Sequence, residues 1–198
     1  HGPGLWLDID NRYALIEECV AADNAGSGIY IEISGWCTIR DNVAVRNGTG
    51  SGNEVKGWGS AGIKIAESRG CVVTRNLCAW NRDGISMREG GPRSFRNRHG
   101  QETVWWCEDN LFTRNLLVEN RGYAFAFWSD NNHFGKHPNH QGPLTAEDLK
   151  KRPALDPRDM RFTVDFNVYV TAEENSPMML WGCPWREKSR TFSRLEAV

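Results

Sequence analysis

The chain of 198 residues lacks the features that mark several protein classes. No uninterrupted apolar run approaches the roughly 18–20 residues of a membrane span, so we expect no membrane partner. Neither charge is in excess, with 24 basic and 25 acidic side chains, which argues against nucleic acid as the main partner. The six cysteines include no CxxC pair and are too sparse for a disulfide scaffold. The opening residues His1–Gly4 show no signal-peptide pattern.

Lysine is scarce as well, with six Lys against 18 Arg, whereas tryptophan is abundant at nine residues. Arginine and tryptophan present flat, forked or stacking surfaces that suit planar or ring-shaped ligands. Hydrophobic residues make up 39% of the chain, which is enough for a folded core despite a mean hydropathy of -0.57.

A repeat dominates the sequence and predicts its architecture. Five glycine-led segments have apolar residues at their second and fourth positions: 4–8, 28–32, 62–66, 84–88 and 122–126. Their shortest spacing is 22 residues, and nothing in them has a helical period. Short strands in a unit of this length are typical of a parallel β-helix, in which alternate residues point inward and outward.

A second motif places asparagines at matching positions of successive repeats. One set contains Asn42, Asn76, Asn115 and Asn167, and the other contains Asn24, Asn47, Asn81 and Asn120. We expect each set to stack as an amide ladder at a turn, because asparagine tolerates a left-handed backbone and bonds local backbone groups. Cys19 interrupts the first ladder. Cys37 and Cys71 share a column, which favours stacked thiols, with a disulfide as the alternative.

The predicted fold class is therefore all-β, a parallel β-helix of about four to five coils with loop insertions and one short helix. Residues 1–130 form the coils, with insertions at 48–61 and 91–110. Residues 131–161 form a His- and Pro-rich excursion with the helix near Thr145–Lys151, where Thr145 and Asp148 fit a capping box. Residues 162–198 form a last partial coil and a C-terminal cap, which is loosely packed from Ser176.

Two outward columns of the first strands carry the candidate chemistry. The third-position column reads Trp6, Tyr30, Lys64, Ser86 and Ala124, and the fifth-position column reads Asp8, Glu32, Ala66, Arg88 and Ala126. Neighbouring strands lie about 4.8 Å apart, so Asp8 and Glu32 should stand side by side with Trp6 and Tyr30 beside them.

Two adjacent carboxylates suggest acid–base chemistry on sugars. Their spacing approaches the roughly 5–5.5 Å of retaining glycosidases, and their mutual repulsion pushes their pKa values apart. Aromatic rings alongside would stack on sugar rings. The alternative is an ordinary solvated polar face, but like charges directly opposite one another cost stability, which favours a functional role.

Other residues complete the predicted site or its surroundings. Trp128, Asp130 and His133 follow the fifth strand and are predicted to contribute to substrate binding. His133, His137 and His140 have an unspecific spacing on a Pro/Gly-rich loop, so we predict no metal site there. Glu67 and Glu89 should begin turns and bond backbone or arginine, with a place in the lining of the groove as the alternative for Glu89. The tryptophans predicted to pack rather than bind are Trp36, Trp80, Trp105 and Trp106.

The run from Gly4 to Asn11, followed one coil later by Gly28 to Ser34, resembles right-handed parallel β-helix carbohydrate-active proteins, and is most similar to β-helical glycoside hydrolases of the β-xylosidase type. The resemblance implies that Asp8 is the nucleophile and Glu32 the acid/base. We expect an oligosaccharide or a plant or microbial polysaccharide as substrate, and no cofactor, with a calcium ion as the alternative. We also expect an extracellular or periplasmic location. The departure is length, because members of that group are much longer.

Two alternatives stay open beside a retaining glycoside hydrolase. In a uronate lyase or epimerase, Lys64 would abstract a proton with help from Arg88, while Asp8 and Glu32 would hold calcium. The third hypothesis is a non-catalytic, carbohydrate-binding β-helix segment. Because an open coil exposes strand edges and apolar core, we also expect another chain or a further segment to cap the ends of the helix.

Overall fold

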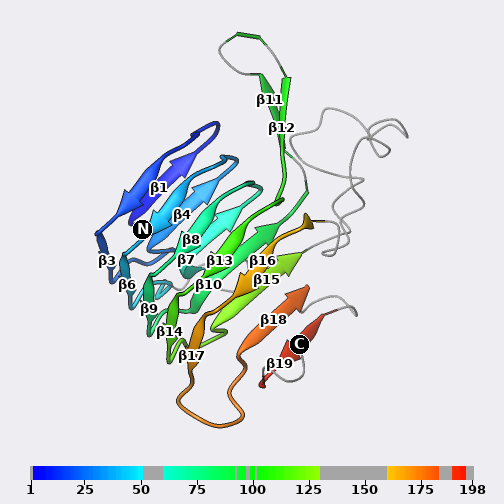
Figure 1. Ribbon diagram of the computed structural model, residues 1–198. Helices are drawn as coiled ribbons and strands as arrows, with labels where there is room; N and C mark the ends of the chain where they lie inside the picture. The colour runs from blue at the N-terminus through cyan, green and yellow to red at the C-terminus, as the bar shows by residue number, and fades with distance from the viewer. Residues whose placement is uncertain are drawn as a thin grey trace.

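The computed structural model describes residues 2–50, 60–91, 93–96, 99–100, 102–129, 160–182 and 189–194. Within them the chain winds through three strands per coil, and equivalent strands of successive coils pair in parallel. This confirms the predicted parallel β-helix. Figure 1 shows the coils stacked in chain order, with the N-terminus at one end of the stack and the C-terminal strands at the other.

Three sheets form the walls of the stack, and all their strands pair in parallel except the last strand of the first sheet. The first sheet has the order β1 (Leu5–Asp8), β4 (Ile29–Glu32), β7 (Ala61–Ala66), β10 (Asp83–Glu89), β15 (Phe125–Ser129), β18 (Met179–Gly182) and β19 (Arg190–Phe192). The second contains β2 (Leu15–Glu17), β5 (Thr38–Arg40), β8 (Val72–Thr74), β13 (Leu111–Thr113) and β16 (Thr163–Asp165). The third contains β3 (Val20–Ala22), β6 (Val43–Val45), β9 (Leu77–Ala79), β14 (Leu116–Val118) and β17 (Val168–Val170).

The core lies inside the coils and follows the predicted alternation. Ile29, Ile31, Ile63 and Ile65 of the first sheet are all fully buried. The central residues of the inner strands of the other two sheets, such as Ile39, are also fully buried, whereas those of some end strands, such as Ile16, are half-buried. Cys37 and Cys71 lie in the same core as free thiols, which confirms the interpretation as stacked thiols over the disulfide.

Steric crowding explains why a glycine lies near the start of strands in the first sheet. A Cβ added to Gly62 would lie 2.7 Å from Nδ2 of Asn81 and 2.8 Å from the carbonyl oxygen of Gly84. Contacts this short do not occur for real Cβ atoms, so the ladder asparagine and the next strand leave no room for a side chain. The repeated glycine therefore marks where the second asparagine ladder packs against the first sheet.

Both predicted ladders are present, but their backbone differs from the prediction. Asn42 donates from its backbone N and from Nδ2 to Oδ1 of Asn76, both at 3.0 Å, and Asn76 bonds Asn115 in the same way. The left-handed residue is the one before each asparagine, such as Asp41 with φ of 57° and Arg75 with φ of 55°. The expectation that asparagine itself takes the left-handed conformation is therefore wrong. Its amide instead bonds the neighbouring coils.

The register of the fifth coil also differs from the prediction. Ile85 pairs with Phe125 and Arg88 with Trp128, so Ala124, rather than Gly122, occupies the position of Gly84. Gly122 lies two residues before this position, so aligning Gly122 with the other strand-leading glycines gives the wrong register. A shift of two residues keeps the face of a strand residue, so Phe125 remains inward, as predicted. The predictions for the two residues before β15 are wrong: Tyr123, expected inward, packs against Trp128, and Ala124, expected outward, joins the core.

The C-terminal segment is more regular than expected. β18 adds to β15 in parallel and buries Leu180 completely, and β19 then pairs with β18 in antiparallel orientation. The prediction of a loosely packed cap from Ser176 is therefore wrong for these strands. The expected helix near Thr145–Lys151 and most of the excursion at 131–161 lie outside the described residues.

The insertion at 91–110 forms an antiparallel hairpin of β11 (Arg93–Arg96) and β12 (Glu102–Trp105), which stands away from the coils in Figure 1. Its base is fixed by Trp105, which is fully buried, with the guanidinium groups of Arg12 and Arg69 at 5.3 and 5.5 Å from its ring centroid. The ring fills the space above Gly35, where a Cβ would lie 2.4 Å from Trp105. Trp105 therefore packs, as predicted.

Candidate functional site

The outward side of the first sheet brings the predicted acids together. Asp8 on β1 pairs in register with Glu32 on β4, and Trp6 pairs with Tyr30 in the same two strands. Glu32 is followed in its column by Ala66 of β7, and Ala66 by Arg88 of β10. The parallel pairing therefore places the two carboxylates on neighbouring strands beside an aromatic pair.

The aromatic pair forms one end of a stacked column. The rings of Trp6 and Tyr30 lie 5.7 Å apart between centroids with an interplanar angle of 5°. Nζ of Lys64 lies 4.5 Å from the centroid of the Tyr30 ring, a cation–π contact. Tyr30 and Lys64 are buried, whereas Trp6 is 52% exposed. Trp6 is thus the ring of this column that is open to a ligand.

A buried ionic network lies beside the column. Nη2 of Arg88 donates to Oε1 of Glu32 at 2.9 Å and to Oε2 of Glu67 at 3.0 Å. Glu67 follows β7 with a left-handed φ of 40°, and its Oε1 accepts a bond from the backbone N of Gly90 at 3.0 Å. The prediction that Glu67 bonds backbone and arginine is confirmed. Arg88 is therefore held by two protein carboxylates.

Asp8 differs from Glu32 in its surroundings. It is exposed at the outer strand of the sheet, yet its pKa is raised above the ordinary value of 3.8. Partial loss of hydration is the main cause and the negative charge of Glu32 is the second, while a backbone hydrogen bond from Ile9 and the charge of Arg93 act in the opposite direction. Asp8 thus retains a proton more readily than an ordinary aspartate.

Arg93 is a residue that the sequence did not assign to the site. It lies on the hairpin strand β11, far from Asp8 in sequence, and its charge acts on Asp8. No repeat position marks it, because the hairpin is an insertion between two coils. Only the folding of the hairpin beside the first coils reveals its proximity.

Trp128 lies on the outward side of β15, next to Arg88, but it is not exposed as expected. Its side chain is 4% exposed, its Nε1 donates to Oδ2 of Asp83 at 3.0 Å, and its ring makes an edge contact with Tyr123. Burial raises the pKa of Asp83 to about 6. Trp128 is thus covered by its own neighbours in this conformation.

The remaining predicted residues are distributed as follows. Asp130 and His133 lie outside the described residues, as do His137 and His140. Across the described part of the chain, no three side chains of metal-binding type gather into a group. Glu89 accepts bonds from the backbone N of Gly91 and Cys107 at 2.8 and 2.6 Å, as predicted for a residue that begins a turn.

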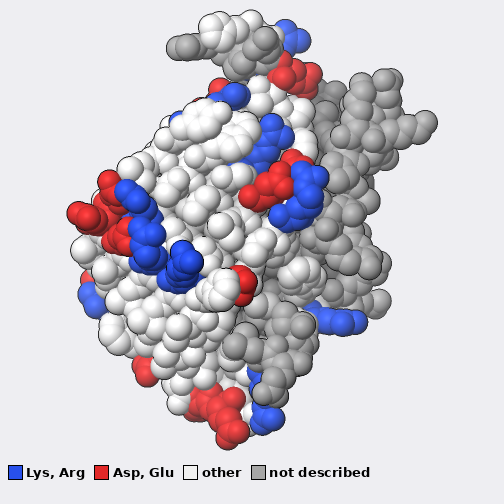
Figure 2. Space-filling view, in the orientation of Figure 1, with Lys and Arg blue, Asp and Glu red and all other residues white. Residues whose placement is uncertain are grey.

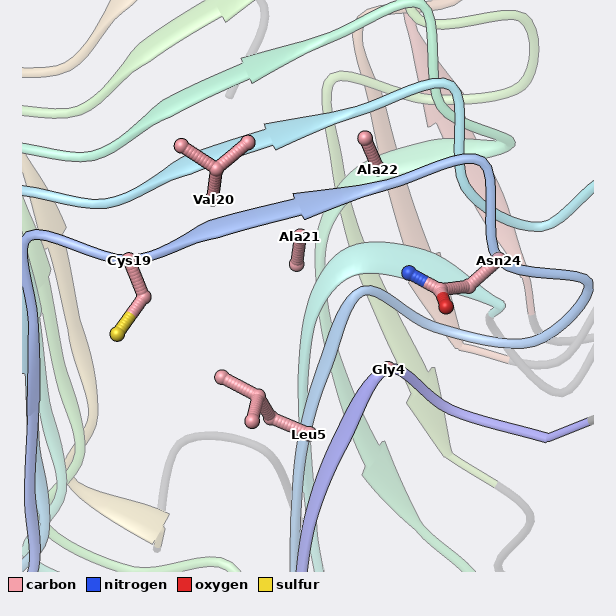
Figure 3. Close-up of a pocket in the computed structure, with 7 residues that line it drawn as sticks. All are labelled: Gly4, Leu5, Cys19, Val20, Ala21, Ala22 and Asn24. Atoms are coloured by element: carbon pink, nitrogen blue, oxygen red, sulfur yellow. The ribbon is translucent and has the colours of Figure 1, made fainter.

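A pocket of about 420 Å³ opens at the end of the first coil, on the inward side of β1 and β3. Figure 3 shows Leu5, Cys19 and Ala21 pointing into it from these strands. Its lining contains no charged side chain, and Asp8 points to the opposite side of β1. The pocket is therefore the apolar mouth of the coil and is separate from the carboxylate pair.

The comparison with protein families agrees with this geometry. The model described as the right handed beta helix region matches residues 1–52, which span coil one and most of coil two. The chain folds as a right-handed β-helix. No curated protein and no solved structure matches this β-helix. In its described residues, no helix is both long and apolar enough for a membrane span.

Proposed function

We propose that this β-helix is a carbohydrate-active protein, and specifically a retaining glycoside hydrolase whose catalytic pair is Asp8 and Glu32. The observation that carries the proposal is the in-register pairing of these two acids on neighbouring parallel strands, beside the stacked rings of Trp6 and Tyr30. Adjacent strands separate such carboxylates by about the 5–5.5 Å that double displacement requires. The exposed ring of Trp6 offers a surface on which a sugar ring stacks.

The surroundings of the two acids favour one division of roles. Asp8 is exposed and has a raised pKa, which suits a proton donor. Glu32 lies against the guanidinium of Arg88, so a negative charge on it is balanced by a fixed positive charge. We therefore assign Asp8 as the acid/base and Glu32 as the nucleophile, the reverse of the roles that the resemblance to β-xylosidases implies.

The proposed reaction has two displacement steps. In the first, a Glu32 oxygen forms a bond to the anomeric carbon while the glycosidic C–O bond breaks, and Asp8 gives its proton to the leaving oxygen. In the second, Asp8 takes a proton from water, the water oxygen bonds to the anomeric carbon, and Glu32 leaves as a carboxylate. The sugar therefore keeps its anomeric configuration.

The contacts of the two basic residues weigh against the lyase alternative. Arg88 is bound by Glu32 and Glu67, and Lys64 is buried on the Tyr30 ring. A base that abstracts a proton from a uronate must reach the sugar, and a buried side chain packed on an aromatic ring is poorly placed to do so.

Turnover of a panel of aryl glycosides and oligosaccharides tests the proposal. Asp8→Asn should lose about 10²–10⁴-fold on substrates whose leaving group needs a proton, and much less on activated dinitrophenyl glycosides. Glu32→Gln should lose activity on both kinds of substrate. Glu17→Gln, which removes an acid on the second sheet of the same coil, is the matched control and should change neither.

Product analysis distinguishes the remaining outcomes. Proton NMR of the first-formed sugar should show retained configuration, and inversion would exclude double displacement. An unsaturated product absorbing in the ultraviolet would identify a lyase instead. Oligosaccharide binding without any product would leave a binding module and overturn the hydrolase.

A further inference from the structure

Glu67 is a buried acid at a position where the first two coils carry apolar residues. It follows β7 in register with Ile33 and Ile9, and all three residues have a left-handed backbone. Glu67 is only 2% exposed. A buried charge costs free energy that an apolar residue does not, so the acid at this position needs an explanation other than packing.

Ion pairs elsewhere in the protein lie at the surface. Arg46 pairs with Asp23 and Arg75 with Asp41, and these side chains are 36–62% exposed. Figure 2 shows acidic and basic side chains in neighbouring groups on the surface in view. In the ionic network of Arg88, by contrast, no side chain is more than 16% exposed. Water therefore screens the charges of this network less, and they act more strongly on one another.

The contacts of Glu67 show that it carries the negative charge of a carboxylate. Its Oε2 accepts a bond from Nη2 of Arg88 and its Oε1 accepts one from the backbone N of Gly90, both at 3.0 Å. Donors on both oxygens favour the ionised acid. The neighbouring Glu89 instead keeps its proton at neutral pH, because burial and, second, the charge of Glu67 raise its pKa to about 8. Glu67 therefore supplies a fixed negative charge beside Arg88.

The proposed reaction moves negative charge away from Arg88. When an oxygen of Glu32 bonds to the anomeric carbon, its carboxylate becomes an uncharged ester. Asp8 gives its proton to the leaving oxygen and becomes charged, and the charge of Arg93 acts on it. One of the carboxylates that bind Arg88 thus loses its charge in the first step, while Glu67 keeps its own.

We propose that Glu67 is a positioning residue, which holds Arg88 in place and balances its charge while Glu32 is esterified. This inference rests on the proposed function and on Glu32 as the nucleophile. Without the charge of Glu67, Arg88 would favour the free carboxylate of Glu32 over the ester more strongly. Formation of the ester would become slower and its hydrolysis faster, because the charge that is lost in the first step is regained in the second.

A double-mutant cycle on stability tests the charge balance without any substrate. Glu32→Gln gives this side chain the uncharged state that it has in the ester, and Glu67→Gln removes the fixed charge with little change in shape. Each single change should lower the midpoint of urea unfolding modestly. The double variant should lower it by clearly more than the two shifts combined, because Arg88 then loses the charge of both acids. Adding Arg88→Met should raise the midpoint again, or restore folding where the double variant fails to fold.

Rapid kinetics with an activated dinitrophenyl glycoside separates the two chemical steps. Glu67→Gln should slow the first release of dinitrophenol roughly tenfold and speed the hydrolysis of the glycosyl-enzyme. Mass spectrometry of the intact protein should accordingly find less covalent adduct. A loss of structure would slow both steps, so the opposite signs identify the positioning role. Glu17→Gln, which removes an acid paired with Arg40 on the second sheet, is the matched control and should alter neither step.

The outcomes separate this inference from the proposed function. Peptide mapping of the trapped adduct should place the sugar on Glu32. A sugar on Asp8, additive shifts in the stability cycle, or equal slowing of both steps would overturn the role of Glu67 and leave the glycoside hydrolase standing. A chain that turns over no glycoside would overturn both.

Discussion

At the scale of single residues, the charged side chains on the first sheet differ in burial. Asp8 is exposed, while Glu32, Glu67 and Lys64 are buried and paired within the protein. Burial of charges is tolerated only when each has a partner, and Arg88 provides that partner for two of the acids. The consequence is a fixed electrostatic background around one accessible carboxyl group.

Glu89 should make the stability of the protein depend on pH. Burial and, second, the charge of Glu67 raise its pKa from the ordinary value of 4.5 to about 8. Between these values the folded protein keeps a proton that the unfolded chain releases, so the free energy of unfolding should fall as pH rises. This contribution is fully present below pH 4.5 and is lost as the pH passes through 8.

Urea unfolding measured between pH 6 and pH 8 tests this effect. The raised pKa of Asp83, about 6, accounts for changes below that window, and the lowered pKa of Cys37, about 7, acts in the opposite direction within it, so the comparison of variants carries the test. Glu89→Gln should flatten the dependence of the unfolding free energy on pH, since a carboxamide does not titrate. Glu17→Gln, at a half-exposed position, should retain the slope of the unchanged protein. Identical slopes for all three proteins would contradict the assignment to Glu89.

At the scale of elements, the hairpin of β11 and β12 is attached to the coils at two points. Glu89 accepts hydrogen bonds from Gly91 before the hairpin and from Cys107 after it, and Trp105 packs into the space over Gly35. The glycine and the tryptophan are far apart in sequence but complementary in shape. The hairpin that carries Arg93 toward Asp8 therefore depends on a residue of coil two.

A double-mutant cycle on Gly35 and Trp105 should show strong coupling. Trp105→Ala removes a fully buried ring and should cost about 3–5 kcal/mol of unfolding free energy. Gly35→Ala should also destabilise, because its Cβ would lie 2.4 Å from the ring. The double variant should cost clearly less than the two single changes combined, since the smaller residue leaves room for the methyl group. Additive costs would show that the two residues do not share this space.

At the scale of the whole molecule, stability is distributed along the stack. Coil three pairs with a coil on each side, whereas coil one pairs only with coil two among the described strands. In proteins built from stacked repeats, each unit is stabilised by its immediate neighbours. The inward residue Leu5 of coil one is 39% exposed, whereas Ile29, its partner in coil two, is fully buried.

Amide hydrogen exchange should reveal this gradient. Protection factors of β1, β2 and β3 should be lower than those of β7, β8 and β9, because the outer coil opens without separating the rest of the stack. Mass spectrometry of peptides from each coil measures the difference. Equal protection in coils one and three would indicate that the stack opens only as one cooperative unit.

The repeat made most of the fold predictable from the sequence. Alternation within each glycine-led strand identified the core, and the column of Asp8 and Glu32 followed from spacing alone. Three features were beyond that reasoning. Gly122 resembles the strand-leading glycines but does not occupy their position. Trp128 is buried and bonds Asp83. Arg93 lies on an insertion and its charge acts on Asp8. Each depends on contacts between segments that no repeat position relates.

The register of the fifth coil determines which side chains meet on its outer surface. A slip of one residue would exchange interior and exterior, while a slip of two keeps the core intact and renews every lateral contact on the surface. In this way Trp128, rather than Ala126, stands next to Arg88. A change of register by an even number of residues therefore changes which outward residues are neighbours and leaves the inward residues in the core.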